Sequence, residues 1–429
     1  MQKKILVSQL QLGMHLLRLD GSWLNHPFWK SRFVIEDPSD LDNLWACGIE
    51  WCWIDTELGK DLVAAAVLSE APPEAPPVAP AELSAEPAVP PEAPRVNPPA
   101  ATRPSPLGER SMAAEIKQAA AICNRGREAV TAMFKEARMG HAVDAQQCLP
   151  LVEEISGSVL RNPDALVSLA RLKSRDDYSY MHSVAVCALM ISLARKCGMA
   201  DDACREAGLA GLLHDIGKAL MPLEVLNKPG KLSDDEFELI RTHPVRGHEL
   251  LSGGHGASEA ALDVALHHHE RMDGTGYPFR KPGDQLSVLA RMGAICDVYD
   301  AITSNRPYKA GWDPAQSMAR MASWKGHFDP QLFAHFVQSL GIYPTGSVVK
   351  LASGNLAVVV EQNASHLVVP VVMVFFSGKS HKRVPPQKLD LARPGTQDRI
   401  VGREEGAKAR FPGLDALWAD PETLSRVKE

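Results

Sequence analysis

The chain lacks the features that would place it in a membrane or outside the cell. No segment reaches the roughly 20 consecutive apolar residues that a membrane-spanning helix needs. The short apolar run at residues 5–7 is followed by polar residues, so it does not form a signal peptide. None of the eight cysteines lies in a Cys-x-x-Cys pair, and Cys47 and Cys52 are the closest two. This pattern favours reduced thiols, and we expect a soluble, cytoplasmic protein.

The chain also lacks a strong imbalance of charge. Its 46 lysines and arginines against 52 aspartates and glutamates give a net charge of −6, and no basic stripe is present. This charge distribution excludes a protein that coats nucleic acid. It is compatible with a local basic pocket that binds a small anion. Hydrophobic residues make up 45% of the 429 residues, and this length predicts two or three domains.

Residues 1–62 predict a small accessory module. Residues 51–55 read Trp-Cys-Trp-Ile-Asp, which alternates and is rich in strand-forming residues. Residues 10–14 predict a strand that runs into a turn. Further aromatic bulk for a small core comes from Trp23, Phe28, Trp29 and Phe33. Residues 63–110 are rich in proline, alanine and glutamate, so they predict an extended linker that buries no core.

A mainly helical region follows at residues 111–343, where apolar residues recur at helical spacing. Residues 344–400 contain three short β-branched runs, which predict a small antiparallel appendage. The runs span residues 348–351, 356–360 and 367–369. Residues 401–429 predict a polar, loosely ordered tail. The expected fold class is mainly α, with a small β-containing N-terminal module and a short C-terminal β appendage.

The residues that suggest chemistry begin with an adjacent pair, His214 and Asp215, near a predicted helix end. An imidazole nitrogen and a carboxylate oxygen side by side are donors that first-row transition metals take. Asp215 has two oxygens and is a candidate bridge between two ions. Lys218, predicted one turn beyond His214 on the same helix face, places a cation over an anion held there. The alternative is a capped helix end with a surface lysine.

Four other segments supply further candidates. They contain His182, His243 before Pro244, the run His267, His268, His269 and Glu270, and the pair Asp297 and Asp300. The two aspartates fall in an apolar helical pattern, where a charge is costly unless it is paired or bound to a metal. A lone buried histidine, by contrast, is more often a core residue than a ligand.

Together these segments predict that five histidines and two aspartates converge from separate helices. They are His182, His214, Asp215, His243, His268, His269 and Asp297. Seven such ligands suit two octahedral ions that share one carboxylate, a type of site that turns water into hydroxide for phosphoryl displacement. Arg306 and Lys309 add positive charge beyond Asp297, and arginine matches phosphate geometry in a bidentate way. The structural alternative is a helical bundle with incidental buried histidines.

The order and spacing of these motifs resemble the HD-GYP family, over residues 150–343. The resemblance includes the pair His214-Asp215 with its Ile-Gly-Lys sequence and the signature at residues 268–278. The signature comprises His268-His269-Glu270, Asp273-Gly274 and Gly276-Tyr277-Pro278. Residues 1–62 resemble, more loosely, a short module that is often found before HD-GYP domains.

This resemblance implies an HD-type helical bundle with a dinuclear site, which usually holds iron and in some members manganese. One ion would be held by His182, His214, Asp215 and Asp297. The other would be held by Asp215, His243, His268 and His269. Asp215 and Lys218 would be the catalytic residues. Four residues before His182, three-metal members have a glutamate where this chain has Tyr178, so we expect two ions rather than three.

The resemblance also implies a substrate. The family opens cyclic di-GMP to linear pGpG, in some members continues to GMP, and in others acts on 3′,3′-cGAMP. Lys218, Arg306 and Lys309 match positions that contact the substrate phosphates. The loop of Gly276, Tyr277 and Pro278 lies beside the substrate in the family and is implicated in contacts with diguanylate cyclases or other signalling proteins. Neither a nucleic-acid partner nor membrane insertion is implied, and the oligomeric state stays open.

This chain departs from the family pattern near that loop. The usual family sequence at residues 279–284 contains a leucine and a second glycine, and this chain has a different run there. The shape of the outer edge of the substrate site is therefore left undefined. His267 adds a third adjacent histidine, which we interpret as a non-ligand.

Three other functions remain as alternatives. They are an HD phosphohydrolase acting on another nucleotide, a receptor that binds the dinucleotide without turnover, and a diiron oxygenase. The Gly-Tyr-Pro loop and the cations Lys218, Arg306 and Lys309 favour the cyclic dinucleotide phosphodiesterase. The presence of all seven ligands argues against the receptor.

Overall fold

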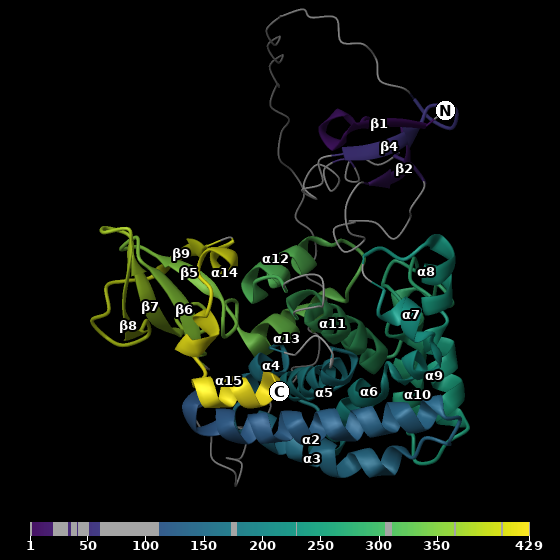
Figure 1. Cartoon of the computed structure of the whole chain (residues 1–429), viewed down its shortest axis with the longest axis horizontal. Coiled ribbons are helices and arrows are strands. Elements are labelled where there is room, and N and C mark those ends of the chain that lie inside the picture. Colours follow the sequence, from purple (N-terminus) through teal and green to yellow (C-terminus); the bar gives the residue numbers. More distant parts are fainter. Residues whose placement is uncertain are drawn as a thin grey trace, which may run out of the picture. The chain divides into compact units, whose positions relative to one another are not determined.

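The computed structural model describes two units of the chain (Figure 1). The described residues are 2–19, 33–35, 41, 51–60, 111–172, 178–228, 230–304, 311–363, 366–404 and 406–428. The first four ranges belong to the N-terminal unit and the others to the second unit. The predicted linker at 63–110 and the aromatic residues Trp23, Phe28 and Trp29 lie outside the described residues.

The N-terminal unit contains a four-stranded antiparallel sheet in the order β1-β4-β2-β3. Its strands are β1 (Gln2–Leu6), β2 (His15–Leu19), β3 (Phe33–Val34) and β4 (Trp51–Asp55). The strand predicted at residues 51–55 is confirmed, with Cys52 and Ile54 buried. Of the strand running into a turn that we predicted at residues 10–14, the turn is confirmed and the strand is wrong. Gly13 has a φ of +88°, which belongs to a turn, and strand β2 begins only at His15.

The second unit is built mainly from helices. Its longer helices are α2 (Met112–Arg138), α3 (Leu149–Arg161), α4 (Pro163–Ala170), α5 (Tyr178–Lys196), α6 (Asp201–Leu213), α9 (His243–Ser252), α10 (Glu259–His267), α11 (Val288–Thr303), α12 (Pro314–Ser323) and α13 (Pro330–Leu340). Shorter elements are η3 (Ala145–Cys148), η4 (Ile216–Leu220), α7 (Leu223–Leu226), α8 (Asp234–Ile240) and η5 (Gly283–Gln285). The mainly helical fold class is confirmed. None of the described helices is both long and apolar enough to cross a membrane.

Helix α5 lies at the centre of this unit, surrounded by other helices (Figure 1). Every residue from Met181 to Ala194 is buried, which is expected for a helix that is apolar on all sides. Helix α6 packs along α5, and α11 packs against it as well. Because the apolar side chains leave no solvent beside α5, a polar residue on this helix must find its partners on the neighbouring helices.

Side-chain caps fix where the helices around α5 begin. Ser258 Oγ accepts a hydrogen bond from the Ala261 amide ahead of α10, and Ser287 Oγ accepts one from Ala290 ahead of α11. Such caps satisfy amide groups that have no partner inside the helix. They therefore set the register at which α10 delivers His268 and α11 delivers Asp297 to the interior.

A five-stranded antiparallel sheet follows the helices, in the order β8-β7-β6-β5-β9. Its strands are β5 (Val348–Leu351), β6 (Leu356–Glu361), β7 (Val371–Ser377), β8 (Lys382–Asp390) and β9 (Ile400–Arg403). The first two predicted runs are confirmed, whereas the third was placed too early, because β7 starts at Val371. Strand β8 was not predicted because it is polar and contains two prolines, which an edge strand with an irregular register tolerates.

The segment that follows the sheet is more ordered than expected. We predicted a loosely ordered polar tail at residues 401–429. The structure instead forms β9, α14 (Ala407–Arg410), η6 (Leu414–Leu417) and α15 (Pro421–Lys428), and α15 lies beside α2 (Figure 1). Phe411, Trp418 and Leu424 belong to the main hydrophobic core. These few apolar residues are separated by charged ones, so the average polarity of the segment concealed them.

Candidate metal centre

The His-Asp pair lies where helix α6 ends. Leu213 is the last residue of the helix, His214 follows it as the C-cap, and the 3-10 helix η4 begins after Asp215. We had predicted that Lys218 shares a helix face with His214, but the helix ends before His214, so this prediction is wrong. Nζ of Lys218 instead lies 2.5 Å from Oδ2 of Asp215. The tight turn after Asp215 depends on Gly217, because a Cβ there would lie 2.0 Å from the carbonyl oxygen of His243.

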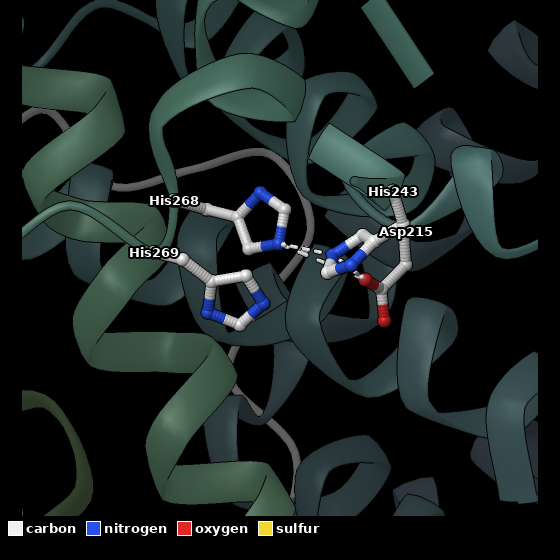
Figure 2. Close-up of side chains that lie close together, drawn as sticks. All are labelled: Asp215, His243, His268 and His269. Carbon is white, nitrogen blue, oxygen red and sulfur yellow. Dashed lines mark hydrogen bonds and ion pairs between the residues drawn. The ribbon is translucent and has the colours of Figure 1, made fainter. Parts of the chain in front are cut away.

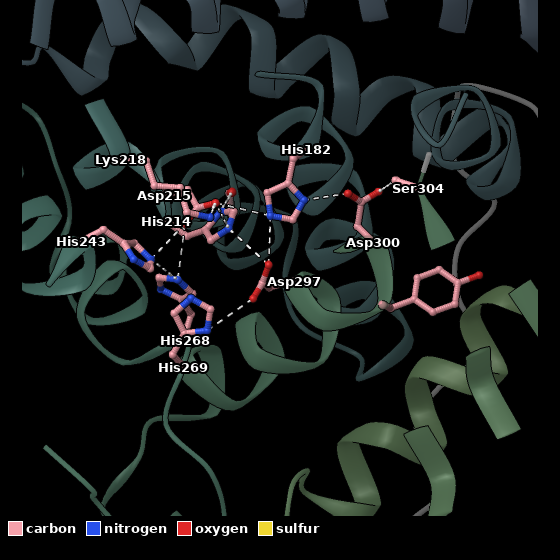
Figure 3. A network of polar contacts seen from close by, with 12 residues as sticks. His182, His214, Asp215, Lys218, His243, His268, His269, Asp297, Asp300 and Ser304 are labelled. Atoms are coloured by element: carbon pink, nitrogen blue, oxygen red, sulfur yellow. Dashed lines mark hydrogen bonds and ion pairs between the residues drawn. The ribbon is translucent and has the colours of Figure 1, made fainter. Parts of the chain in front are cut away.

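The seven predicted ligands come from five places in the second unit and meet at one point (Figure 3). His182 lies on α5, His243 is the first residue of α9, and Asp297 lies on α11. His268 is the C-cap of α10, and His269 follows it. Most of the seven are almost inaccessible to solvent, and His269 is the most exposed, with 15% of its side chain accessible.

Six of the seven residues form two groups that share Asp215. Ligand atoms of Asp215, His243, His268 and His269 lie within 4.8 Å of one another, and so do those of His182, His214 and Asp215. Figure 2 shows the first group, with the histidine rings turned toward the carboxylate. The resemblance implied a similar division for two ions, with Asp297 added to the group of His182, His214 and Asp215.

The two oxygens of Asp215 face different groups. Oδ1 lies 3.2 Å from Nε2 of His243 and 3.6 Å from Nε2 of His268. Oδ2 lies 3.4 Å from Nε2 of His214 and 3.5 Å from Nε2 of His182. A carboxylate with one oxygen toward each set of imidazoles would offer one oxygen to each of two cations.

Asp297 also reaches both groups (Figure 3). Its Oδ1 lies 2.9 Å from Nε2 of His182 and 3.9 Å from Nε2 of His214, whereas its Oδ2 lies 3.6 Å from Nδ1 of His269. The resemblance assigned Asp297 to the ion held with His182 and His214, and its shortest contact is the one to His182.

Hydrogen bonds to backbone carbonyls orient three of the histidine rings. Nδ1 of His214 lies 2.7 Å from the Gly211 oxygen, and Nδ1 of His243 lies 2.7 Å from the Ile240 oxygen. Nδ1 of His268 lies 3.0 Å from the oxygen of Val264. Each Nδ1 therefore carries the proton and donates it, which leaves an Nε2 lone pair directed to the centre.

The surroundings of His243 and Asp215 favour the protonation states that bind divalent cations, whereas hydrogen bonds to Asp297 and Asp300 raise the pKa of His182 despite its burial. Burial lowers the pKa of His243 to about 4, despite its contact with Asp215. Burial alone would raise the pKa of Asp215, but Lys218 and the neighbouring histidines hold it well below its usual range. Neutral imidazoles and ionised carboxylates are the forms that bind metals. Among the described residues, Nε2 of His214 and Oδ1 of Asp215 are buried without a hydrogen-bond partner, so the residues fit a pair of ions.

Asp300 has a role that we did not predict. We noted that its charge needs a partner in an apolar helix, but left that partner unassigned. Its Oδ2 lies 2.7 Å from Nδ1 of His182, and its Oδ1 accepts a hydrogen bond of 3.0 Å from Ser304 Oγ (Figure 3). A carboxylate behind a histidine ligand fixes the ring and increases its basicity. The three-residue spacing from Asp297, on one face of α11, is the signal that could have identified it.

Replacing Asp300 with alanine is expected to weaken metal binding about 10- to 100-fold, the usual cost of losing the partner behind a histidine ligand. The change removes the acceptor from Nδ1 of His182, so the ring turns more freely. Titration of the protein with metal in a chelator buffer measures the effect. Ser304→Ala is the control, because it removes the hydroxyl that donates to Oδ1 of Asp300 and leaves the contact with His182 in place. Unchanged affinity in Asp300→Ala would assign the pair a purely structural role.

The Gly-Tyr-Pro loop lies directly against the predicted ligand His269. The ring of Tyr277 stacks on His269, with 4.6 Å between ring centroids, and Arg241 lies 4.9 Å from the Tyr277 ring. Gly276 lies against the backbone of residues 269–271, and a Cβ on it would be 2.5 Å from Cα of Glu270. The loop thus depends on a residue without a side chain at this position, and it brings Tyr277 to the edge of the cluster.

The remaining predicted contacts are placed differently. Arg306 and Lys309 lie outside the described residues. On either side of them, Ser304 Oγ donates a hydrogen bond to Asp300, and the Trp312 amide donates one to the Ile302 oxygen. His267 is turned away from the cluster, toward Asp263 and Lys281. Its contacts agree with our interpretation of this histidine as a non-ligand.

Comparison with known proteins defines the class. The family model described as "HD domain" matches residues 162–332, and the one described as "Domain of unknown function (DUF3391)" matches residues 2–148. The helical unit with its His-Asp pair is therefore an HD domain. A solved HD-GYP-type protein of Bdellovibrio bacteriovorus is 16% identical and covers 78% of this chain and 98% of that one, with a TM-score of 0.44.

Two curated relatives are more similar in sequence. A protein of Pseudomonas aeruginosa named as a cyclic di-GMP phosphodiesterase is 51% identical over 419 residues, which cover 97% of this chain and 96% of the relative. The cyclic di-GMP phosphodiesterase response regulator RpfG of Xanthomonas campestris is 40% identical over 32% of this chain and 37% of its own length. The chain belongs to the HD-GYP family, with a DUF3391 domain at its N-terminus.

Proposed function

We propose that this protein is a metal-dependent phosphodiesterase that opens cyclic di-GMP to linear pGpG in the cytoplasm. The observation that carries the proposal is the position of Asp215, whose two oxygens face two separate histidine groups. Two divalent ions held there would supply Lewis-acid activation of water and of the phosphate. The nearly full-length relative that is named as a cyclic di-GMP phosphodiesterase supports the choice of substrate.

The chain's own residues would position the substrate around this centre. Lys218, with 23% of its side chain accessible, reaches Asp215 from the solvent side and is the described cation best placed to meet a phosphate oxygen. Arg306 and Lys309 are proposed as further phosphate contacts. Gly276, Tyr277 and Pro278 are proposed to border the bound dinucleotide and to offer a surface to a signalling partner.

The proposal is tested by incubating the purified, metal-loaded protein with cyclic di-GMP and, separately, with 3′,3′-cGAMP. Chromatography then identifies the products. We expect pGpG from cyclic di-GMP, at a higher rate than any product from 3′,3′-cGAMP. Preferred cleavage of 3′,3′-cGAMP would support the alternative nucleotide substrate. Tight binding of cyclic di-GMP without any product would instead make the protein a receptor.

Metal analysis is expected to find two ions per chain, with iron as the proposed metal and manganese as the alternative. The expectation is supported by the two groups that share Asp215, each of which would hold one ion. A third ion would need another carboxylate near His182, where the sequence has Tyr178, and a phenol with a pKa near 10 is a poor ligand at neutral pH. The side chain of Tyr178 lies outside the described residues. A reproducible third ion in protein loaded with iron and in protein loaded with manganese would contradict the expectation.

A further inference from the structure

A short segment after the Gly-Tyr-Pro loop, which we call the lip (residues 279–281), is fastened to the chain that carries the ligands. The Phe279 amide donates a hydrogen bond of 2.7 Å to Oε1 of Glu270, and the Lys281 amide donates one of 3.1 Å to Oε2. Glu270 is 2% exposed and directly follows the predicted ligand His269. The backbone of the lip is therefore held next to the candidate centre.

The Lys281 side chain adds a second attachment. Its Nζ lies 3.0 Å from Nε2 of His267, whose Nδ1 lies 2.7 Å from Oδ1 of Asp263. Because an ammonium group can only donate, Nε2 of His267 accepts and Nδ1 carries the proton that is donated to Asp263. Asp263 Oδ2 accepts in turn from Ser287 Oγ, at 2.5 Å. Ser287 caps α11, so the relay connects the lip with both α10 and α11.

The lip presents two side chains outward. Phe279 is 54% exposed, although it is a large aromatic residue. Arg280 is exposed and has a φ of +57°, a left-handed conformation that glycine adopts more readily. Non-glycine residues in this conformation cluster at ligand-binding and active sites, so Arg280 is a candidate contact for a bound ligand. Aromatic faces stack on nucleobases, and guanidinium groups pair with phosphates and with the guanine edge.

We propose that Lys281, acting through His267 and Asp263, is a positioning residue that holds the lip against the half of the dinucleotide that does not react. The relay would favour an intact cyclic dinucleotide over a small phosphodiester, which does not extend to the lip. His267 and Lys281 are both positions at which this chain departs from the HD-GYP pattern. The inference rests on the proposed function and adds to it a determinant of substrate preference.

The test compares two substrates, cyclic di-GMP and bis(p-nitrophenyl) phosphate, with the full-length, metal-loaded protein. Lys281→Met is expected to raise KM for cyclic di-GMP about tenfold, because the lip must be ordered on binding. Its kcat should stay within about twofold, and its kinetics with the small phosphodiester should not change. Lys281→Arg should restore most of the affinity, since it keeps a donor at the same place.

A matched control and a double variant make the interpretation specific. Lys388→Met removes a lysine that is paired with Glu361 in the C-terminal sheet, and it should leave both substrates unaffected. His267→Ala should raise KM as Lys281→Met does, and the double variant should be no worse than either single one. Metal content and melting temperature, measured for each variant, verify that the fold and the centre are intact.

Three outcomes would overturn the positioning role. The first is an unchanged KM in Lys281→Met, the second an equal loss with both substrates, and the third additive effects in the double variant. The wild-type assay separates these failures from failure of the proposed function. If the wild type cleaves bis(p-nitrophenyl) phosphate but not cyclic di-GMP, the proposed substrate is wrong and the positioning role falls with it.

Discussion

Replacement of Asp215 with asparagine is expected to lower kcat on cyclic di-GMP by on the order of 10³-fold. The carboxylate oxygens of Asp215 face two different histidine groups, so each oxygen is available to one ion. An asparagine keeps the shape of the side chain but replaces one oxygen with an amide nitrogen, which does not bind a divalent cation. One ion should therefore be lost or weakly held, and the remaining ion should not support the reaction.

Metal analysis and steady-state kinetics on the same preparation test this expectation. Asp144→Asn is the matched control, because Asp144 lies in the same unit but caps η3 with its side chain, a role that asparagine also fills. The control should retain both ions and full activity. Two tightly bound ions and near-normal turnover in Asp215→Asn would mean that Asp215 is not the bridge, and the dinuclear interpretation would fail.

The candidate centre was more predictable from the sequence than the surrounding elements. Histidine and aspartate at motif spacing have few alternative explanations when they occur in apolar helices, where unpaired charge is costly. Asp297 therefore stood out, whereas His182 was assigned only in combination with the other segments. Asp300 was noticed but not assigned, because its three-residue spacing from Asp297 indicates the shared helix face but not the partner His182, which lies 118 residues away.

The β structure was predicted only where the strands are locally distinctive. Strand β4 alternates between buried and more exposed residues, and its limits were predicted correctly. Strand β8 is stabilised by its pairing with β7 rather than by its own composition, so a propensity argument misses it. The same reasoning applies to residues 407–424, where Trp418 and Leu424 pack into a core assembled largely from residues more than 60 positions earlier.

Replacement of Lys218 with methionine is the change that we expect to separate catalysis from metal binding. Nζ of Lys218 lies 2.5 Å from Oδ2 of Asp215, while 23% of the side chain remains accessible. Asp215 is itself 2% exposed, so the ammonium group is the part of this pair that an incoming anion can reach. Charge that develops on the phosphate oxygens would therefore meet this cation directly.

Lys218→Met should lower kcat about 10²- to 10³-fold, the usual cost of losing one charged donor that stabilises a transition state. Two ions should remain, because histidines and carboxylates rather than the lysine bind them. Lys218→Arg should recover part of the rate, since the positive charge is kept but its position changes. Lys228→Met is the matched control, because Lys228 is likewise paired with one carboxylate, that of Glu236. If Lys218→Met loses an ion along with its activity, the lysine acts by holding Asp215 in place. If Lys218→Met keeps both its ions and its activity, Lys218 has no part in the centre, and Arg306 and Lys309 alone must bind the phosphate.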